Sequence, residues 1–172
     1  NPITPTDKPP VLWNNLAAVL ATGQNILFQT PYIICDDSMY ATFYRLTGEG
    51  RQISFVTNAV ASGSNLWGCT DYLREKPNIL ATGCRVYEFS GDASSHSKAI
   101  LMDGRISIVG SYNLDLRSTY LDTEVMLVID SPELNAQLQA VADAELYQSR
   151  EALENDEYIY AGGYVHRKLN PV

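Results

Sequence analysis

The sequence has few cysteines that could form disulfides or bind a metal, and it has no apolar run long enough to span a membrane. Its 172 residues include only three cysteines, Cys35, Cys69 and Cys84. An odd number of widely spaced cysteines, none at metal-ligand spacing, indicates free thiols in a reducing compartment. The longest apolar run, near residues 26–35, is interrupted by polar residues and proline, and it is far shorter than the ~20 residues that span a bilayer. With no signal peptide apparent, we expect a cytoplasmic protein or one at the cytoplasmic face of a membrane.

Basic residues are also scarce. Lysine and arginine total 12 against 20 aspartates and glutamates, which gives a formal net charge of -8. A broad, non-specific nucleic-acid binder needs a basic surface, so nucleic acid is not the expected partner. The same negative charge does not favour anionic lipid, so peripheral membrane contact would need a local patch or a second half of the protein. The sequence contains no Gly-rich nucleotide loop and no internal repeat.

The length fits one domain with a substantial core. Residues 1–10 are rich in proline and suggest a linker or frayed terminus, residues 11–154 form the domain, and residues 155–172 are expected to form a C-terminal tail. Helical and extended patterns alternate through the domain. This alternation predicts an α/β fold, a three-layer α-β-α sandwich built on a mixed β-sheet.

The individual elements have local signals. Helices are predicted over residues 11–21, 38–46 and 66–80, the last with a break at Pro77, and strands over 25–34, 52–57, 85–89 and 122–130, the last as a central strand. Ser131 and Pro132 form a strong helix start, and that helix is expected to run to about Leu153. Its apolar positions lie near helical spacing and should face the core: Leu134, Leu138, Val141 and Leu146.

One stretch of the chain carries a chemical pattern. It has the form H-x-K-x4-D, then G-S-x-N, then a further acid, and these positions are filled by His96, Lys98, Asp103, Gly110, Ser111, Asn113 and Glu124. Residue types at such fixed offsets rarely arise by chance in a chain of this length. The pattern therefore marks a candidate site.

Local geometry predicts how the pattern converges. Residues 97–102 and 105–109 predict two strands, and the Asp-Gly pair between them predicts an antiparallel hairpin. Alternation along the first strand would place His96 and Lys98 on one face. The hydroxyl and amide of the G-S-x-N segment follow the second strand, so the hairpin would bring both pairs to one edge.

Each residue also has a structural interpretation. His96 alone could be a surface residue, Lys98 a solvated one, and Ser111 and Asn113 turn formers. Asp103 is structural in either interpretation, because it lies on the opposite strand face and precedes a glycine. Taken together, the residues favour a catalytic site over these structural interpretations. A neutral imidazole is a competent nucleophile, and a nearby cation can hold a phosphate oxygen.

The pattern resembles the catalytic motif of the phospholipase D superfamily. The run from Gly110 to Ser118, with Asp122-Thr123-Glu124 after it, resembles the second half of bacterial cardiolipin synthases, as does the upstream segment 29–34. Asp122 stands where such enzymes usually carry asparagine, which weakens the subfamily assignment but not the catalytic one.

The resemblance implies an active site made of two such motifs, whose histidines face each other across a phosphodiester. One histidine attacks phosphorus and forms a phosphohistidine, and the other protonates the leaving alcohol and then activates the acceptor. In two-motif members the second half supplies the acid/base, which would be His96; in a symmetric dimer either copy of His96 could attack. No metal or organic cofactor is implied.

The resemblance also implies a role for each remaining motif residue. Lys98, Ser111 and Asn113 would bind the phosphate. Glu124 would accept a hydrogen bond from the histidine and fix its tautomer. The structural positions of the motif would be Asp103, Gly110 and Arg117.

The function expected from this resemblance is transfer of a phosphatidyl group to the hydroxyl of another phospholipid. The chain would be the C-terminal half of a cardiolipin synthase-like enzyme, and its partners would be a phospholipid substrate and an N-terminal motif-bearing half or second subunit. Three alternatives stay open: a phospholipase D that hydrolyses phospholipid, a homodimeric phosphodiesterase or endonuclease, and a non-catalytic half that acts as a scaffold.

Overall fold

The computed structural model describes residues 9–63 and 66–168, with side chains described from residue 68 in the second range. The strands are β1 (Asn25–Gln29), β2 (Gln52–Asn58), β3 (Arg85–Phe89), β4 (Ala99–Met102), β5 (Ile106–Gly110), β6 (Met126–Asp130), β7 (Ser149–Ala152) and β8 (Tyr158–Tyr160). The helices are α1 (Val11–Leu20), α2 (Asp37–Gly48), α3 (Leu66–Ala81), α4 (Leu116–Tyr120), α5 (Pro132–Tyr147) and the short 3-10 helix η1 (Glu154–Asp156).

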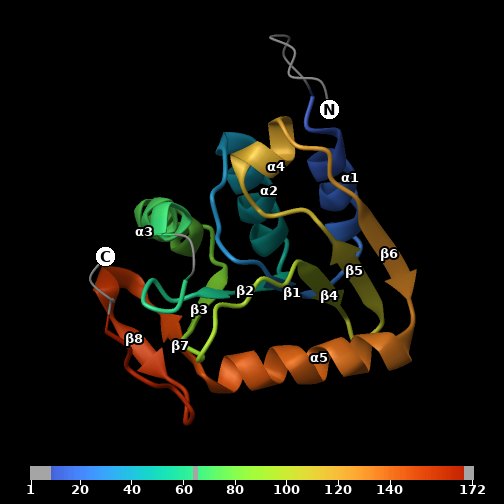
Figure 1. Cartoon of the computed structure of the whole chain (residues 1–172). Helices are drawn as coiled ribbons and strands as arrows, with labels where there is room; N and C mark the ends of the chain where they lie inside the picture. The colour runs from blue at the N-terminus through green and yellow to red at the C-terminus, as the bar shows by residue number, and fades with distance from the viewer. Residues whose placement is uncertain (1–8, 64–65, 169–172) are drawn as a thin grey trace.

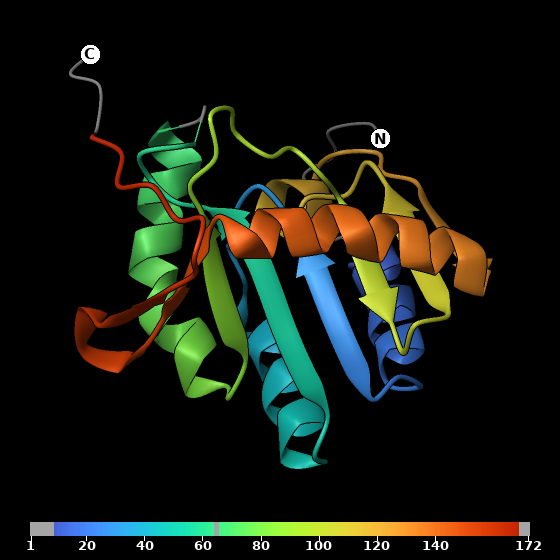
Figure 2. The same ribbon diagram turned by 90° about the horizontal axis from the view of Figure 1, so that it is seen from below.

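Within these ranges the strands form one sheet in the order β6-β5-β4-β1-β2-β3-β7-β8. The three central strands β1, β2 and β3 run parallel, and the strands on both sides pair antiparallel. Helices α1 to α4 lie on one side of the sheet, and α5 crosses the other (Figure 1). The predicted three-layer sandwich on a mixed sheet is confirmed. The view in Figure 2 shows the parallel strands pointing to one edge of the sheet.

The main core lies between the sheet and helices α1 and α2. Its centre is a group of aromatic rings, in which Phe43 meets Trp13, Phe28 and Phe55 at centroid distances of 5.6, 6.0 and 5.3 Å, all edge to face. Edge-to-face pairs add to the large hydrophobic gain of burying such rings. This packing fixes β1 and β2, and the ends of these two strands border the candidate site.

Two predicted strands differ from the structure. The strand expected over 25–34 ends at Gln29, because Pro31 has no N–H to continue the ladder. The strand expected over 122–130 as a central strand is β6, an edge strand whose Leu127 and Val128 are 59% and 54% exposed. A hydrophobic run can mark a strand, but it does not say whether another strand covers its far edge.

Two predicted helices also differ. The break expected at Pro77 is absent, because α3 continues through this residue to Ala81. The final helix is capped as predicted, with the Ser131 hydroxyl accepting from the Leu134 amide at 3.2 Å, but it ends at Tyr147 instead of about Leu153. The chain then turns into β7, which pairs with β3.

The face that α5 turns to the sheet is only partly the one predicted, because Leu134, Leu138 and Leu146 are half-buried but Val141 is not. Val141 is 52% exposed, whereas Asn135 and Ala142 are 1% and 0% exposed. The Asn135 amide donates to the Ile106 carbonyl at 2.8 Å and to the Ser107 hydroxyl at 3.2 Å. Because these bonds satisfy a buried polar side chain, the helix can turn asparagine to the sheet and leave valine in solvent.

The C-terminal part of the chain extends the sheet. Within its described residues, the segment expected as a tail, 155–172, contributes most of η1 and all of β8. A buried ionic cluster holds this end: Glu88, 0% exposed, accepts from Arg150 Nε at 2.8 Å and from the Tyr72 hydroxyl at 2.9 Å. The three cysteines are free and buried. None of the helices in the described ranges is long and apolar enough to cross a membrane.

Candidate active site

The predicted hairpin carries the first half of the motif. Strands β4 and β5 pair antiparallel with Met102 opposite Ile106, and in the three-residue connection Asp103 and Gly104 both have positive φ, 52° and 66°. The Arg105 amide donates to the Met102 carbonyl at 3.0 Å and closes this turn. The strand itself begins at Ala99, so His96 and Lys98 lie in the extended lead just before it. The two side chains meet: Lys98 Nζ lies 3.0 Å from His96 Nδ1.

Asp103 lies at the opposite end of β4 from His96. Its carboxylate accepts hydrogen bonds from the Asn25 amide at 2.7 Å and the Gln24 amide at 2.9 Å. Partial burial acts to raise the pKa of Asp103, but these backbone donors outweigh it and lower the pKa. Asp103 therefore ties the hairpin turn to the start of β1.

The second half of the motif follows β5. A Cβ added at Gly110 would lie 2.0 Å from the Val125 carbonyl oxygen, so only glycine allows the chain leading into β6 to approach so closely. Ser111 sits next to this contact, where its hydroxyl accepts from the Val125 amide at 3.1 Å and donates to Glu124.

Glu124 is held by two serine hydroxyls. Ser111 donates to one carboxylate oxygen and Ser118 to the other, the latter at 2.7 Å. The Asn113 amide nitrogen lies 3.4 Å from the Ser118 hydroxyl, so Asn113 joins the same cluster. Ser118 was not predicted as a site residue; its only sequence signal was its place in the Asn-Leu-Asp-x-Arg-Ser run.

A short helix positions Ser118. Asp115, 9% exposed, caps α4 by accepting from the Ser118 amide at 2.6 Å. Burial raises the pKa of the Asp115 carboxyl, although its bonds to Ser118 oppose the shift. Arg117, expected to be structural, has an exposed side chain that pairs with Asp122 at 3.0 Å.

Electrostatics link the two halves of the motif. Partial burial lowers the pKa of the Lys98 ammonium, and the negative charges of Glu124 and Asp115 act against that shift. Among the described residues, His96 contacts Lys98 and Glu124 contacts the serines, with no hydrogen bond between His96 and Glu124. The predicted orienting role of Glu124 stays a prediction.

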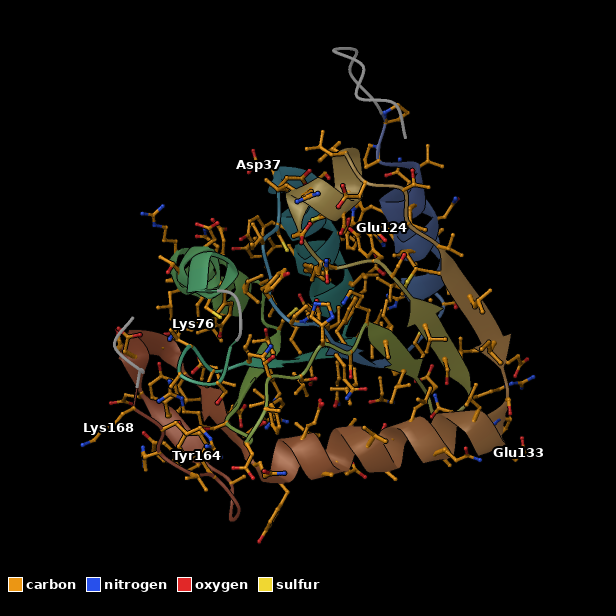
Figure 3. All side chains as sticks on the ribbon, in the orientation of Figure 1. Asp37, Lys76, Glu124, Glu133, Tyr164 and Lys168 are labelled. Carbon is orange, nitrogen blue, oxygen red and sulfur yellow. The ribbon has the colours of Figure 1, made fainter. Side chains whose placement is uncertain are left out.

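A cavity of about 530 Å³ opens beside Glu124. Ser118, Thr119 and Glu124 line one side of it, and Val11 and Leu12 at the start of α1 line the other. Figure 3 shows Glu124 on the side of the sheet that carries α1 and α4. The lining of this cavity includes Glu124 and Ser118 but not His96 or Lys98, so it borders only the acidic side of the cluster. Within the described ranges, no three His, Cys, Asp or Glu side chains are grouped to hold a metal ion.

Comparisons with known proteins agree with this geometry. Residues 16–146 match the family described as cardiolipin synthase, PLD-like domain. Cardiolipin synthase A of Erwinia tasmaniensis is 32% identical over 136 residues, which is 78% of this chain and 27% of that protein. The chain thus spans about a quarter of the length of this curated relative.

Solved structures share the fold at lower identity. The phospholipase D family member Nuc from Salmonella typhimurium superposes with a TM-score of 0.64 at 16% identity, over 81% of this chain and 89% of Nuc. Phosphatidylserine synthase of Haemophilus influenzae gives 0.65 at 18% identity, over 81% of this chain and 36% of the synthase.

The family match covers well over half of the chain, and the extended segment before β4 holds the motif histidine and lysine together. The chain belongs to the phospholipase D superfamily. Within it, the chain is a cardiolipin synthase-like domain.

Proposed function

We propose that this chain is one catalytic half of a phosphatidyltransferase, corresponding to the C-terminal half of a cardiolipin synthase-like enzyme. The observation that carries the proposal is the contact between His96 and Lys98 in a domain of this family. The pair offers a nucleophile or acid/base next to a cation. The remaining half of the site would come from another motif-bearing domain or a second copy of the chain.

The contact also suggests how substrate activates the histidine. Lys98 Nζ lies 3.0 Å from His96 Nδ1 and 3.5 Å from Nε2. An ammonium group has donors only, so in a neutral imidazole the nearer Nδ1 would accept and Nε2 would carry the ring proton. A bound phosphate would draw the ammonium of Lys98 to its non-bridging oxygen. That transfer of the hydrogen bond would free the imidazole at the moment the phosphate arrives.

Asn113 and Ser111 would hold the phosphate with Lys98. The Asn113 amide nitrogen carries two hydrogens, and its contact with Ser118 uses only one of them. The Ser111 hydroxyl has one hydrogen, which it donates to Glu124, so it would have to turn from Glu124 to the phosphate while Ser118 keeps its bond to the carboxylate. Donors aimed at the non-bridging oxygens stabilise the negative charge that grows there in the transition state.

The reaction would proceed in two steps. The nitrogen lone pair of one histidine forms a bond to phosphorus, the bond to the leaving alcohol oxygen breaks, and the second histidine gives that oxygen a proton. The acceptor hydroxyl then loses its proton to the second histidine and attacks phosphorus, which breaks the phosphorus–nitrogen bond. Glu124 would orient a histidine of this pair through its ring N–H.

The test is conversion of phosphatidylglycerol vesicles to cardiolipin and glycerol by the longest form of the protein that carries this domain. His96→Ala should abolish conversion, and wild-type enzyme quenched with detergent at neutral pH should carry a phosphatidyl group on histidine. The chain has one other histidine, and His166→Ala is the matched control because His166 packs against Tyr160 and Tyr164 at the far end of the sheet. Conversion by His96→Ala at the wild-type rate would refute the assignment.

A second candidate is a homodimeric phosphodiesterase. It is suggested by the single motif in this sequence, which a second copy of the chain could complement. The net charge of -8 disfavours nucleic acid as its substrate. Light scattering with an assay on bis-p-nitrophenyl phosphate and DNA tests this candidate, and a monomer without activity on either would exclude it.

A further inference from the structure

Two buried polar side chains lie at the strand ends next to the segment that carries His96. Gln29 ends β1 and Asn58 ends the adjacent parallel strand β2, and each is 3% exposed. The proposed chemistry uses neither of them. A buried polar side chain is retained at low cost only where its hydrogen bonds are satisfied, so their partners show what they do.

Asn58 binds both backbone groups of Ser95. Its amide nitrogen donates to the Ser95 carbonyl at 2.8 Å, and its amide oxygen accepts from the Ser95 N–H at 2.8 Å. The same nitrogen lies 3.2 Å from the Pro31 carbonyl oxygen. The side chain thus takes the place of a neighbouring strand for the residue directly before His96.

Glu145 binds the side chain of the same serine from the opposite layer. It lies in the last turn of α5, where one carboxylate oxygen accepts from the Ser95 hydroxyl at 2.7 Å and the other from the Gln29 amide at 2.7 Å. The Ser149 hydroxyl donates to the Glu145 carbonyl at 2.7 Å and holds that turn to β7. Two elements distant in sequence, β2 and α5, therefore converge on Ser95, and β1 supports the second through Gln29.

His96 lies between two fixed points. On one side is Ser95, which makes three hydrogen bonds to Asn58 and Glu145 through its N–H, its carbonyl and its hydroxyl. On the other side, the Lys98 carbonyl accepts from the Gly110 amide at 3.2 Å and begins the β4–β5 ladder. We propose that Asn58 and Glu145 are positioning residues that hold the His96 imidazole in line with the phosphate.

This inference rests on the proposed function, because it assumes that His96 takes part in the reaction. Misplacing a reacting group by about 1 Å can lower the rate about 100-fold. Asn58→Ala removes both backbone bonds to Ser95 and should lower kcat by about 10- to 100-fold, with KM changed less than about 2-fold, since the lost contact does not bind substrate. Glu145→Gln keeps the shape of the side chain and should lower kcat by about 3- to 10-fold.

The first readout needs no turnover. In NMR spectra of the full chain, the Ser95 amide should exchange with solvent about 10-fold faster in Asn58→Ala, and the His96 ring signals should shift in both variants. Asp143→Asn is the matched control, because Asp143 lies on α5 two residues from Glu145, is exposed and pairs only with Gln139 among the contacts of its described side chain. It should leave both signals and kcat unchanged.

The outcomes separate the two proposals. Wild-type Ser95 exchange and His96 signals in Glu145→Gln and in folded Asn58→Ala would overturn the positioning role, whatever the kinetics. If Asn58→Ala does not fold, Glu145→Gln decides alone. Changed spectra with no turnover by the wild-type protein would support the positioning of His96 and refute the proposed transferase. Changed spectra with a lower kcat, an unchanged KM and a normal Asp143→Asn control are the expected result.

Discussion

Replacing Glu124 with glutamine removes a charge from the site and keeps its shape. Glu124 accepts from the hydroxyls of Ser111 and Ser118. A hydroxyl can donate or accept, so one serine can rotate to receive the new amide group and the cluster can re-form. We therefore expect Glu124→Gln to fold, to lose a modest amount of stability and to lose most of its turnover.

The magnitude follows from the contacts. Two charge-assisted hydrogen bonds become neutral, which should cost about 1–2 kcal/mol of unfolding free energy in total. At about 2–4 °C per kcal/mol for a domain of this size, the melting temperature should fall by about 4 °C. Burial lowers the pKa of Lys98, and of the two carboxylates that oppose this shift Glu124 has the larger effect. Without the charge of Glu124, the Lys98 pKa should move further below its ordinary value.

Turnover should fall about 100-fold, the scale of a lost acid–base contribution. The assay combines cardiolipin formation, a thermal melt and an NMR titration of the Lys98 side chain. Glu154→Gln is the matched control, because Glu154 is an exposed glutamate in η1, distant from the site. Wild-type turnover in Glu124→Gln would contradict the orienting role, and an unchanged Lys98 pKa would contradict the electrostatic link between the two halves of the motif.

Three further predictions concern stability. Asp103→Asn should lower the free energy of unfolding by about 1 kcal/mol, because its bonds to the Gln24 and Asn25 amides become weaker. The pKa of Asp103 is lowered in the folded protein, so the carboxylate stabilises the fold at neutral pH and this contribution is lost as pH falls below about 4. The melting temperatures of wild type and variant should therefore converge in acid. Arg150→Met leaves the carboxylate of buried Glu88 without its closest cation and should cost about 3 kcal/mol in urea unfolding, and a loss below ~1 kcal/mol would contradict this. Pro77→Ala restores a donor inside α3 and should raise stability by about 1 kcal/mol, whereas a lower melting temperature would show that the helix needs its proline.

Local signals predicted the part of the site that is close in sequence. The Asp103-Gly104 turn needs two residues that tolerate positive φ, so the hairpin and the convergence of its ends could be predicted from a few residues. The same reasoning predicted the cap at Ser131. It failed for β6 and for Val141, because apolar residues predict a strand or helix but not which neighbours cover it.

The sequence by itself determined the chemistry available to this protein: a histidine and a lysine two residues apart, a serine, an amide and an acid at the offsets of one superfamily, and a net charge that disfavours nucleic acid. Only the tertiary structure decided which groups meet. It paired Glu124 with Ser118, and it brought Asn58 and Glu145 to Ser95 from different layers of the sandwich. The physical reason is that such contacts join elements far apart in the chain, and packing of helices on the sheet sets their geometry.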